Sequence, residues 1–202
     1  MLCHKPAQLA QIAQEVAPAA KAVASILAAT PLSALKDVYP GIPVYRFLPS
    51  LPAEVRGGAI VQAADPEIDP GTRLSRDAHT DRRVSELFAE LGTLVVLDDS
   101  LIDVAMGLMS CAPAYVALVA EAQVDAGTRR GIPPAQASIL VTATLAGTAE
   151  LLRRRDYDTL AVRREVTSPG GVTARGLAAL ERGGLRAAFD NALDAVLGER
   201  QR

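Results

Sequence analysis

The second half of the chain contains long segments whose side chains are apolar or small on nearly every side. Residues 112–126 read APAYVALVAEAQVDA, and residues 135–152 read AQASILVTATLAGTAELL. A helix that is hydrophobic all round is a buried helix, and in a domain of about a hundred residues such helices usually need a partner subunit. The pattern therefore predicts a homodimer or a higher homo-oligomer. The alternative is a self-contained helical bundle.

Strand-like segments are confined to the first half of the chain. After Asp98 no strand-like alternation returns, and Ala-rich helical segments follow one another. We therefore expect an α/β part at 1–98 and an all-α part at 99–202. Strands are predicted at 22–27, 43–49, 58–64 and 93–98, and a polar loop at 65–76. Helices are predicted at 7–17, 32–38, 81–92, 100–110, 113–130, 134–154, 158–165, 173–182 and 184–198.

The charge balance argues against two classes of partner. The 21 basic and 23 acidic residues give a net charge of −2, whereas a nucleic-acid surface or a polybasic membrane anchor would show a basic excess. No uninterrupted apolar run reaches the ~18 residues of a transmembrane span. Polar residues such as Gln8 and Gln11 also break any signal-peptide core near the start. We expect a soluble protein that binds neither nucleic acid nor a membrane.

Cysteine and histidine are too scarce for a metal site or a Cys–His nucleophile. The chain has two cysteines, Cys3 and Cys111, and two histidines, His4 and His79, and no pair has metal-ligand spacing. Two cysteines are also too few for a disulfide framework, which favours a reducing compartment. The expectation is a cytoplasmic protein without a bound metal.

The stretch Ser168-Pro169-Gly170-Gly171 precedes a predicted amphipathic helix. Two glycines expose consecutive backbone N–H groups, and the following helix adds the positive end of its dipole, which suits a carboxylate or a phosphate. Thr173 adds a hydroxyl that both donates and accepts. The alternative is a plain turn in which Ser168 or Thr173 caps the helix. A second pair, Gly183-Gly184, ends the same helix.

Several separated motifs resemble those of the pyrroline-5-carboxylate reductase family. The most specific is SPGGxTxxGLxxLExGGxR, which spans 168–186. CAPAYVALVAEAQVDAGTRRGIP at 111–133 is similar to the family's helix that begins with Gly-Pro-Ala-Tyr. HKPAQL at 4–9, SILAATPL at 25–32 and RFLPSLPA at 46–53 are similar to family segments in the same order. The resemblance covers most of the chain.

The resemblance implies an α/β plus all-α protein: the C-terminal remainder of a Rossmann-type NAD(P)-binding domain, followed by a helical dimerisation domain. It also implies reduction of 1-pyrroline-5-carboxylate to proline with NADPH or NADH as cofactor, without a covalent nucleophile. Carried over by position, the substrate-binding residues are Asp99, Glu165, Ser168, Gly170, Gly171, Val172 and Thr173, and Thr173 is also the catalytic residue. The implied cofactor-facing positions are Cys3, His4, Lys5, Pro6, Ile26, Leu27 and Ala28.

Departures from the family pattern leave alternatives open. No G-x-G-x-x-G phosphate-binding turn precedes the matched segments, and Met109-Ser110-Cys111-Ala112 replaces the family's Ser-Gly-Ser-Gly. Ser50 and Thr30 replace a family asparagine and glycine. One explanation is that these residues are part of a longer enzyme, which we favour because the strand at 22–27 would otherwise be an uncovered apolar edge. The others are a non-catalytic dimerisation or regulatory paralogue and a reductase of a related cyclic imine.

Overall fold

The computed structural model describes residues 1–65 and 78–198, so most of the predicted loop at 65–76 lies outside the described residues. The chain divides into two compact units. We call Met1–Pro113 the α/β unit and Ala114–Gly198 the helical unit. The predicted boundary near residue 98 stays a prediction.

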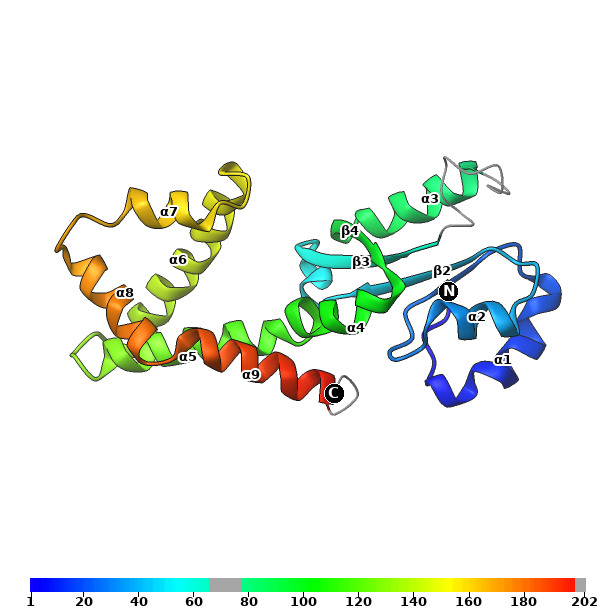
Figure 1. Cartoon of the computed structure of the whole chain (residues 1–202), viewed down its shortest axis with the longest axis horizontal. Coiled ribbons are helices and arrows are strands. Elements are labelled where there is room, and N and C mark those ends of the chain that lie inside the picture. The colour runs from blue at the N-terminus through cyan, green and yellow to red at the C-terminus, as the bar shows by residue number, and fades with distance from the viewer. Residues whose placement is uncertain (66–77, 199–202) are drawn as a thin grey trace. The chain divides into compact units, whose positions relative to one another are not determined.

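The α/β unit is built on a four-stranded mixed sheet (Figure 1). Its strands are β1 (Val23–Ser25), β2 (Val44–Pro49), β3 (Gly58–Ala64) and β4 (Gly92–Asp98), in the order β1-β2-β3-β4. The β1–β2 and β3–β4 pairs are parallel, and the β2–β3 pair is antiparallel. The antiparallel step follows from chain length, because the short connection through the 3-10 turn Leu51–Val55 cannot make the crossover that a parallel pair needs.

Helices cover both faces of this sheet. The helices are α1 (Leu9–Val16), α2 (Leu32–Val38), α3 (Ala78–Ala89) and α4 (Ile102–Ala105). Figure 1 shows α3 and α4 on opposite sides of β3. Alternation along the strands explains this, since successive side chains point to opposite faces. Tyr45, Phe47 and Ile60 pack with Phe88 of α3, whereas Leu48, Val61 and Ala63 pack with Ile102 and Ala105 of α4. A third cluster joins α1 and α2 to β1 and β2: Leu2, Ala13, Val23, Leu27, Leu32, Leu35, Tyr39 and Val44.

Two glycines allow β3 and β4 to begin side by side. Gly92 has a φ of +146°, and a Cβ there would lie 2.0 Å from the carbonyl oxygen of Gly58. A Cβ on Gly58 would lie 2.8 Å from the backbone nitrogen of Ala53. Neither position accepts a side chain without moving backbone, so the register of β3 and β4 depends on both glycines.

The helical unit contains α5 (Ala112–Thr128, of which residues 114–128 lie in this unit), α6 (Pro134–Arg154), α7 (Thr159–Glu165), α8 (Val172–Arg182) and α9 (Leu185–Leu197). Among its described residues the buried hydrophobic side chains are only Ala137 and Val162. Large apolar side chains such as Leu118, Ile139 and Leu140 are exposed. The isolated subunit therefore gives these helices no core of their own.

Two helical stretches, Asp99–Thr128 and Pro134–Arg154, are long and apolar enough to cross a membrane by length and composition alone. Neither stretch is an uninterrupted apolar run, because both helices mix small, polar and apolar residues. A core helix of a soluble protein passes the same test when it is mostly buried, but only 17% and 11% of these two windows are buried here. The sequence-based expectation of no membrane span stays a prediction.

Candidate active site

The Ser-Pro-Gly-Gly turn directly precedes α8 and is closed by one backbone hydrogen bond. The N–H of Gly171 donates to the carbonyl oxygen of Ser168 at 3.0 Å. Gly170 has a φ of +69°, in the region that favours glycine. At Gly171 a Cβ would lie 2.3 Å from Oγ of Ser168. Glycine is therefore favoured at position 170 by the backbone conformation and at position 171 by the close approach of the Ser168 side chain.

The first turn of α8 leaves its backbone N–H groups open. Gly171 is the N-cap residue and carries no side chain, and no side-chain hydrogen bond caps the helix. The first N–H groups of an α-helix have no partner inside the helix, so those of Val172 and Thr173 are available to a ligand. Thr173 is partly buried, while Val172 is exposed. Open amides and the helix dipole together favour an anion.

Arg175, a residue of α8, forms a hydrogen bond back to the Ser-Pro-Gly-Gly turn. Its Nη1 donates to the carbonyl oxygen of Gly170 at 3.0 Å, and its backbone N–H donates to the carbonyl oxygen of Gly171 at 3.2 Å. Among the described residues, no carboxylate lies within ion-pair distance of Arg175. Its positive charge therefore lies beside the turn without a neutralising partner.

Glu165, the last residue of α7, is paired with Arg155. Nε of Arg155 donates to Oε1 of Glu165 at 2.7 Å, and Nη2 donates to Oε2 at 3.4 Å. The hydrogen bond to Glu165 raises the pKa of the exposed Arg155 guanidinium. Only Val166 and Thr167 separate Glu165 from Ser168 along the chain. The ion pair therefore links the end of α7, close to the turn, with the residue that follows α6.

The implied cofactor-facing residues form a second group, in the α/β unit. Leu2 lies parallel to Ser25 of β1, with its N–H donating to Ala24 at 2.7 Å and its carbonyl accepting from Ile26 at 3.1 Å. Cys3 and Ile26 therefore leave the sheet at the same edge. In open α/β sheets, ligands bind at the carboxyl ends of parallel strands, which is where both segments end.

A cavity of about 350 Å³ is lined by Cys3 and His4 together with residues of α1 and the start of β1, and none of Ile26, Leu27 and Ala28 lines it. Nδ1 of His4 lies 2.9 Å from the carbonyl oxygen of Lys5, while its Nε2 is buried without a described hydrogen-bond partner. Lys5, Pro6 and Ala28 are exposed, and Ile26 is partly buried. Leu27 is buried in the core, so only its backbone lies at this edge.

Asp99 lies in the α/β unit, whereas the other six implied substrate positions lie in the helical unit. Its Oδ1 accepts from Nη1 of Arg46 at 2.7 Å, and its Oδ2 accepts from the backbone N–H of Leu32 at 2.9 Å. Both carboxylate oxygens therefore already have a protein donor. The assignment of Asp99 and of the other site residues stays a prediction.

Comparison with known proteins identifies the family. The family model for pyrroline-5-carboxylate reductase dimerisation matches residues 99–202. The pyrroline-5-carboxylate reductase of Synechocystis is 33% identical over 97% of this chain and 71% of its own length. The chain belongs to the pyrroline-5-carboxylate reductase family.

Solved structures agree on the fold. A pyrroline-5-carboxylate reductase from Coxiella burnetii has a TM-score of 0.85 and 24% identity, over 96% of this chain and 72% of that one. The Plasmodium falciparum pyrroline carboxylate reductase, solved with NADP bound, has a TM-score of 0.78 and 24% identity, over 96% and 76%. The expected fold class, family and oxidoreductase class are confirmed, and the dimerisation family confirms a homo-oligomer.

Three arginines of this reductase family member were missed by the sequence analysis: Arg46, Arg155 and Arg175. Arg46 had a usable signal, because a charged residue in the middle of the apolar strand β2 needs a partner when it is buried. Arg155 and Arg175 gave none, because exposed arginines are common on protein surfaces.

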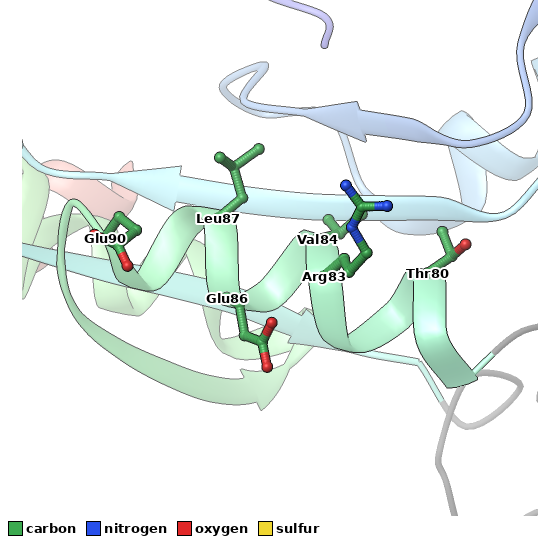
Figure 2. A pocket seen from close by; sticks show the side chains of 6 residues that line it. All are labelled: Thr80, Arg83, Val84, Glu86, Leu87 and Glu90. Carbon is green, nitrogen blue, oxygen red and sulfur yellow. The ribbon is translucent and has the colours of Figure 1, made fainter.

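A separate cavity of about 480 Å³ lies along α3. Figure 2 shows that its labelled lining residues all come from this helix, with Arg83, Glu86 and Glu90 among them. The lining mixes one cation with two carboxylates and the exposed Leu87. None of the residues implied by the family resemblance lines this cavity.

Proposed function

We propose that the helical unit binds the carboxylate of 1-pyrroline-5-carboxylate, and of the product proline, at the Ser-Pro-Gly-Gly turn. The observation that carries this proposal is the uncapped first turn of α8 behind Gly170, whose φ is positive, and Gly171. The family resemblance names the anion, and the open amides of Val172 and Thr173 supply the donors that a carboxylate needs. Arg175 adds a positive charge beside the turn.

The proposed reaction needs positioning and charge stabilisation rather than a covalent nucleophile. When bound, NADPH or NADH would supply a hydride to the carbon of the protonated C=N bond, and the ring nitrogen would become an amine. The amides at the start of α8 hold the carboxylate, and the hydroxyl of Thr173 faces the ring nitrogen. Glu165, held by Arg155, lies at the end of the helix that leads into this turn.

The described residues fit a pyridine nucleotide at the edge where Cys3 and Ile26 leave the sheet. Parallel strands end there, and Nε2 of His4 is buried without a described partner. The segments Cys3–Pro6 and Ile26–Ala28 would hold the nucleotide mainly through backbone groups. We also propose the cytoplasm as the location, which the two free cysteines support.

Calorimetric titration of the chain with proline tests the carboxylate site, with Thr173→Ala as the diagnostic variant. Loss of the hydroxyl is expected to weaken proline binding by at least ~1 kcal/mol while stability stays nearly constant. Thr173→Ser keeps the hydroxyl and is the matched control. A loss of stability with unchanged affinity would instead identify Thr173 as a structural residue. No proline binding by the unaltered chain would refute the carboxylate site.

A related cyclic imine is a second candidate substrate. The segment that departs from the family pattern overlaps a π-helical turn at Met106–Ser110, and such turns frequently occur at functional sites. Assays with pyrroline-5-carboxylate and piperideine carboxylate separate the two substrates. A non-catalytic paralogue would bind proline but show no dinucleotide binding and no turnover.

A further inference from the structure

The segment from Ile26 to Pro31, which we call the β1–α2 loop, is held in an unfavourable conformation. Ala29 has a φ of +50°. A residue that carries a Cβ is sterically destabilised in this left-handed region. Such strain persists only where the surrounding structure over-determines it, and it clusters at ligand-binding sites. The loop contains the three implied cofactor positions that follow β1.

Hydrogen bonds from buried side chains fix the loop from within. Oγ of Ser25 accepts from the N–H of Leu27 at 3.2 Å, and Oγ1 of Thr30 donates to the carbonyl oxygen of Ala28 at 3.0 Å. Ser25 is 0% exposed and Thr30 is 4% exposed.

Asp99 fixes the far end of the loop. Its Oδ2 accepts from the N–H of Leu32, the first residue of α2, across 67 positions of the chain. Pro31, the N-cap residue of α2, makes no side-chain cap, so Asp99 supplies the acceptor that a local cap would otherwise provide. The carboxylate thereby sets where the loop ends and α2 begins.

Arg46 in turn fixes the orientation of Asp99. Its guanidinium is buried in the α/β unit, with its side chain 5% exposed, and Nη1 donates to Oδ1 of Asp99. Nη2 of Arg46 also lies 3.5 Å from Oδ1 of Asp103. Asp103 therefore shares the arginine, but it has no hydrogen bond to the loop among the described residues.

We propose that Asp99 is a positioning residue that holds the strained β1–α2 loop in the shape that contacts the dinucleotide. The inference rests on the proposed function for the assignment of the loop to the cofactor. It gives Asp99 a role through the backbone of Leu32 rather than a direct contact with the imine substrate. Arg46 supports that role by orienting the carboxylate.

Asp99→Ala and Asp103→Ala make a matched pair, because each removes one carboxylate from Arg46 and only the first removes the contact with the loop. We expect Asp99→Ala to speed amide hydrogen exchange at Leu32 about tenfold and to weaken NADPH binding about tenfold, the effect of one lost charge-assisted hydrogen bond. Asp103→Ala should leave both within about twofold. Asp99→Asn keeps one acceptor oxygen and gives a second readout if the alanine variant does not fold.

Proline titration of the same variants separates a positioning role from a substrate contact. The proposal expects unchanged proline affinity in Asp99→Ala, and a selective loss of proline affinity would overturn it. Equal exchange at Leu32 in the two alanine variants would also overturn it. Failure of the unaltered chain to bind NADPH would refute the cofactor part of the proposed function, whereas binding that is insensitive to Asp99 would refute only this inference.

Discussion

At the scale of single residues, Tyr39 has a buried hydroxyl for which the described residues provide no hydrogen-bond partner. It is 1% exposed, and its hydroxyl has no hydrogen-bond partner among the described residues. A buried polar atom without a partner keeps its desolvation cost and gains nothing in return. Tyr45 is the natural comparison, because its hydroxyl donates to Oδ1 of Asp81.

Tyr39→Phe is expected to leave stability unchanged or raise it by up to ~1 kcal/mol, whereas Tyr45→Phe should lower it by a similar amount. Burial raises the pKa of Tyr39 above its ordinary value of 10.0. The stability that depends on its neutral form is therefore complete below pH 10 and is lost as the pH rises through the higher folded pKa. Denaturant titrations between pH 7 and 11 should show a shallower alkaline loss for Tyr39→Phe, and equal slopes would contradict the prediction.

Gly57 and Gly58 are neighbours with opposite tolerance for a side chain. A Cβ on Gly58 would lie 2.8 Å from the backbone nitrogen of Ala53, whereas a Cβ on Gly57 would meet no atom closer than 3.8 Å. Gly58→Ala should therefore lower the free energy of unfolding by about 1–3 kcal/mol, as overpacking does. Gly57→Ala is the control and should stay close to the unaltered chain. Chemical denaturation of both variants measures the difference.

Side-chain partners far apart in sequence were the part of the site that residue patterns could not predict. Arg46 and Asp99 are 53 positions apart, and nothing local in either segment specifies the pairing. The Ser-Pro-Gly-Gly turn was predictable because its chemistry lies in the backbone of four adjacent residues. The family resemblance supplied the roles of the remaining residues, and those roles stay predictions.

At the scale of elements, hydrophobic periodicity and Pro/Gly punctuation predicted the order of helices and strands. The predicted strand at 58–64 and helices at 32–38 and 134–154 match β3, α2 and α6. The predicted strand at 22–27 is shorter in the structure, as β1 (Val23–Ser25). The residues after Ser25 enter the strained loop, whose shape depends on distant groups that a local pattern does not contain.

The junction of α8 and α9 is closed by an ion pair across Gly183-Gly184. Nη2 of Arg186 lies 2.8 Å from Oε1 of Glu181, and Nε lies 2.9 Å from Oε2. Gly184 has a φ of +80°, which lets the chain turn between the helices. The hydrogen bond from Arg186 lowers the pKa of the Glu181 carboxyl below its ordinary value of 4.5.

Glu181→Gln is expected to change the pH dependence of stability in the acid range. A lowered folded pKa contributes stability that is present above the unfolded pKa and is lost as the pH falls through the folded pKa. The melting temperatures of the variant and the unaltered chain should therefore differ at pH 7 and converge as the pH falls through the folded pKa of Glu181, which lies below 4.5. Glu15→Gln, which removes a carboxylate without an ion pair among the described residues, is the control. A difference that persists in acid would argue against the ion pair as its cause.

At the scale of the whole molecule, the two units differ in how they are stabilised. All three clusters of buried hydrophobic residues described above lie in the α/β unit. The helical unit exposes much of its apolar surface, and its match to a dimerisation family supports association with another copy of the chain. The stability of the helical unit is therefore coupled to association.

Ile139→Glu is expected to weaken association and to lower the melting temperature in proportion. Ile139 is 68% exposed on α6, and a charge there would be buried against the partner copy. Leu51→Glu makes the same kind of change at a residue that is 71% exposed in the α/β unit, and it should leave association unchanged. Sedimentation velocity over a range of protein concentrations measures both. Equal dissociation in the two variants would place the interface elsewhere.

The exposed apolar helices of the second unit have a consequence for how such a sequence can change. In a closed symmetric assembly, every substitution on an isologous interface appears once on each side of the symmetry axis. A single codon change therefore alters the interface in two places, and its free-energy effect is doubled for each pair of subunits. Small residues change contact area least when they are exchanged, and α5 and α6 are rich in alanine. We expect exchanges among these small residues to perturb association less than exchanges of the larger exposed side chains on the same helices.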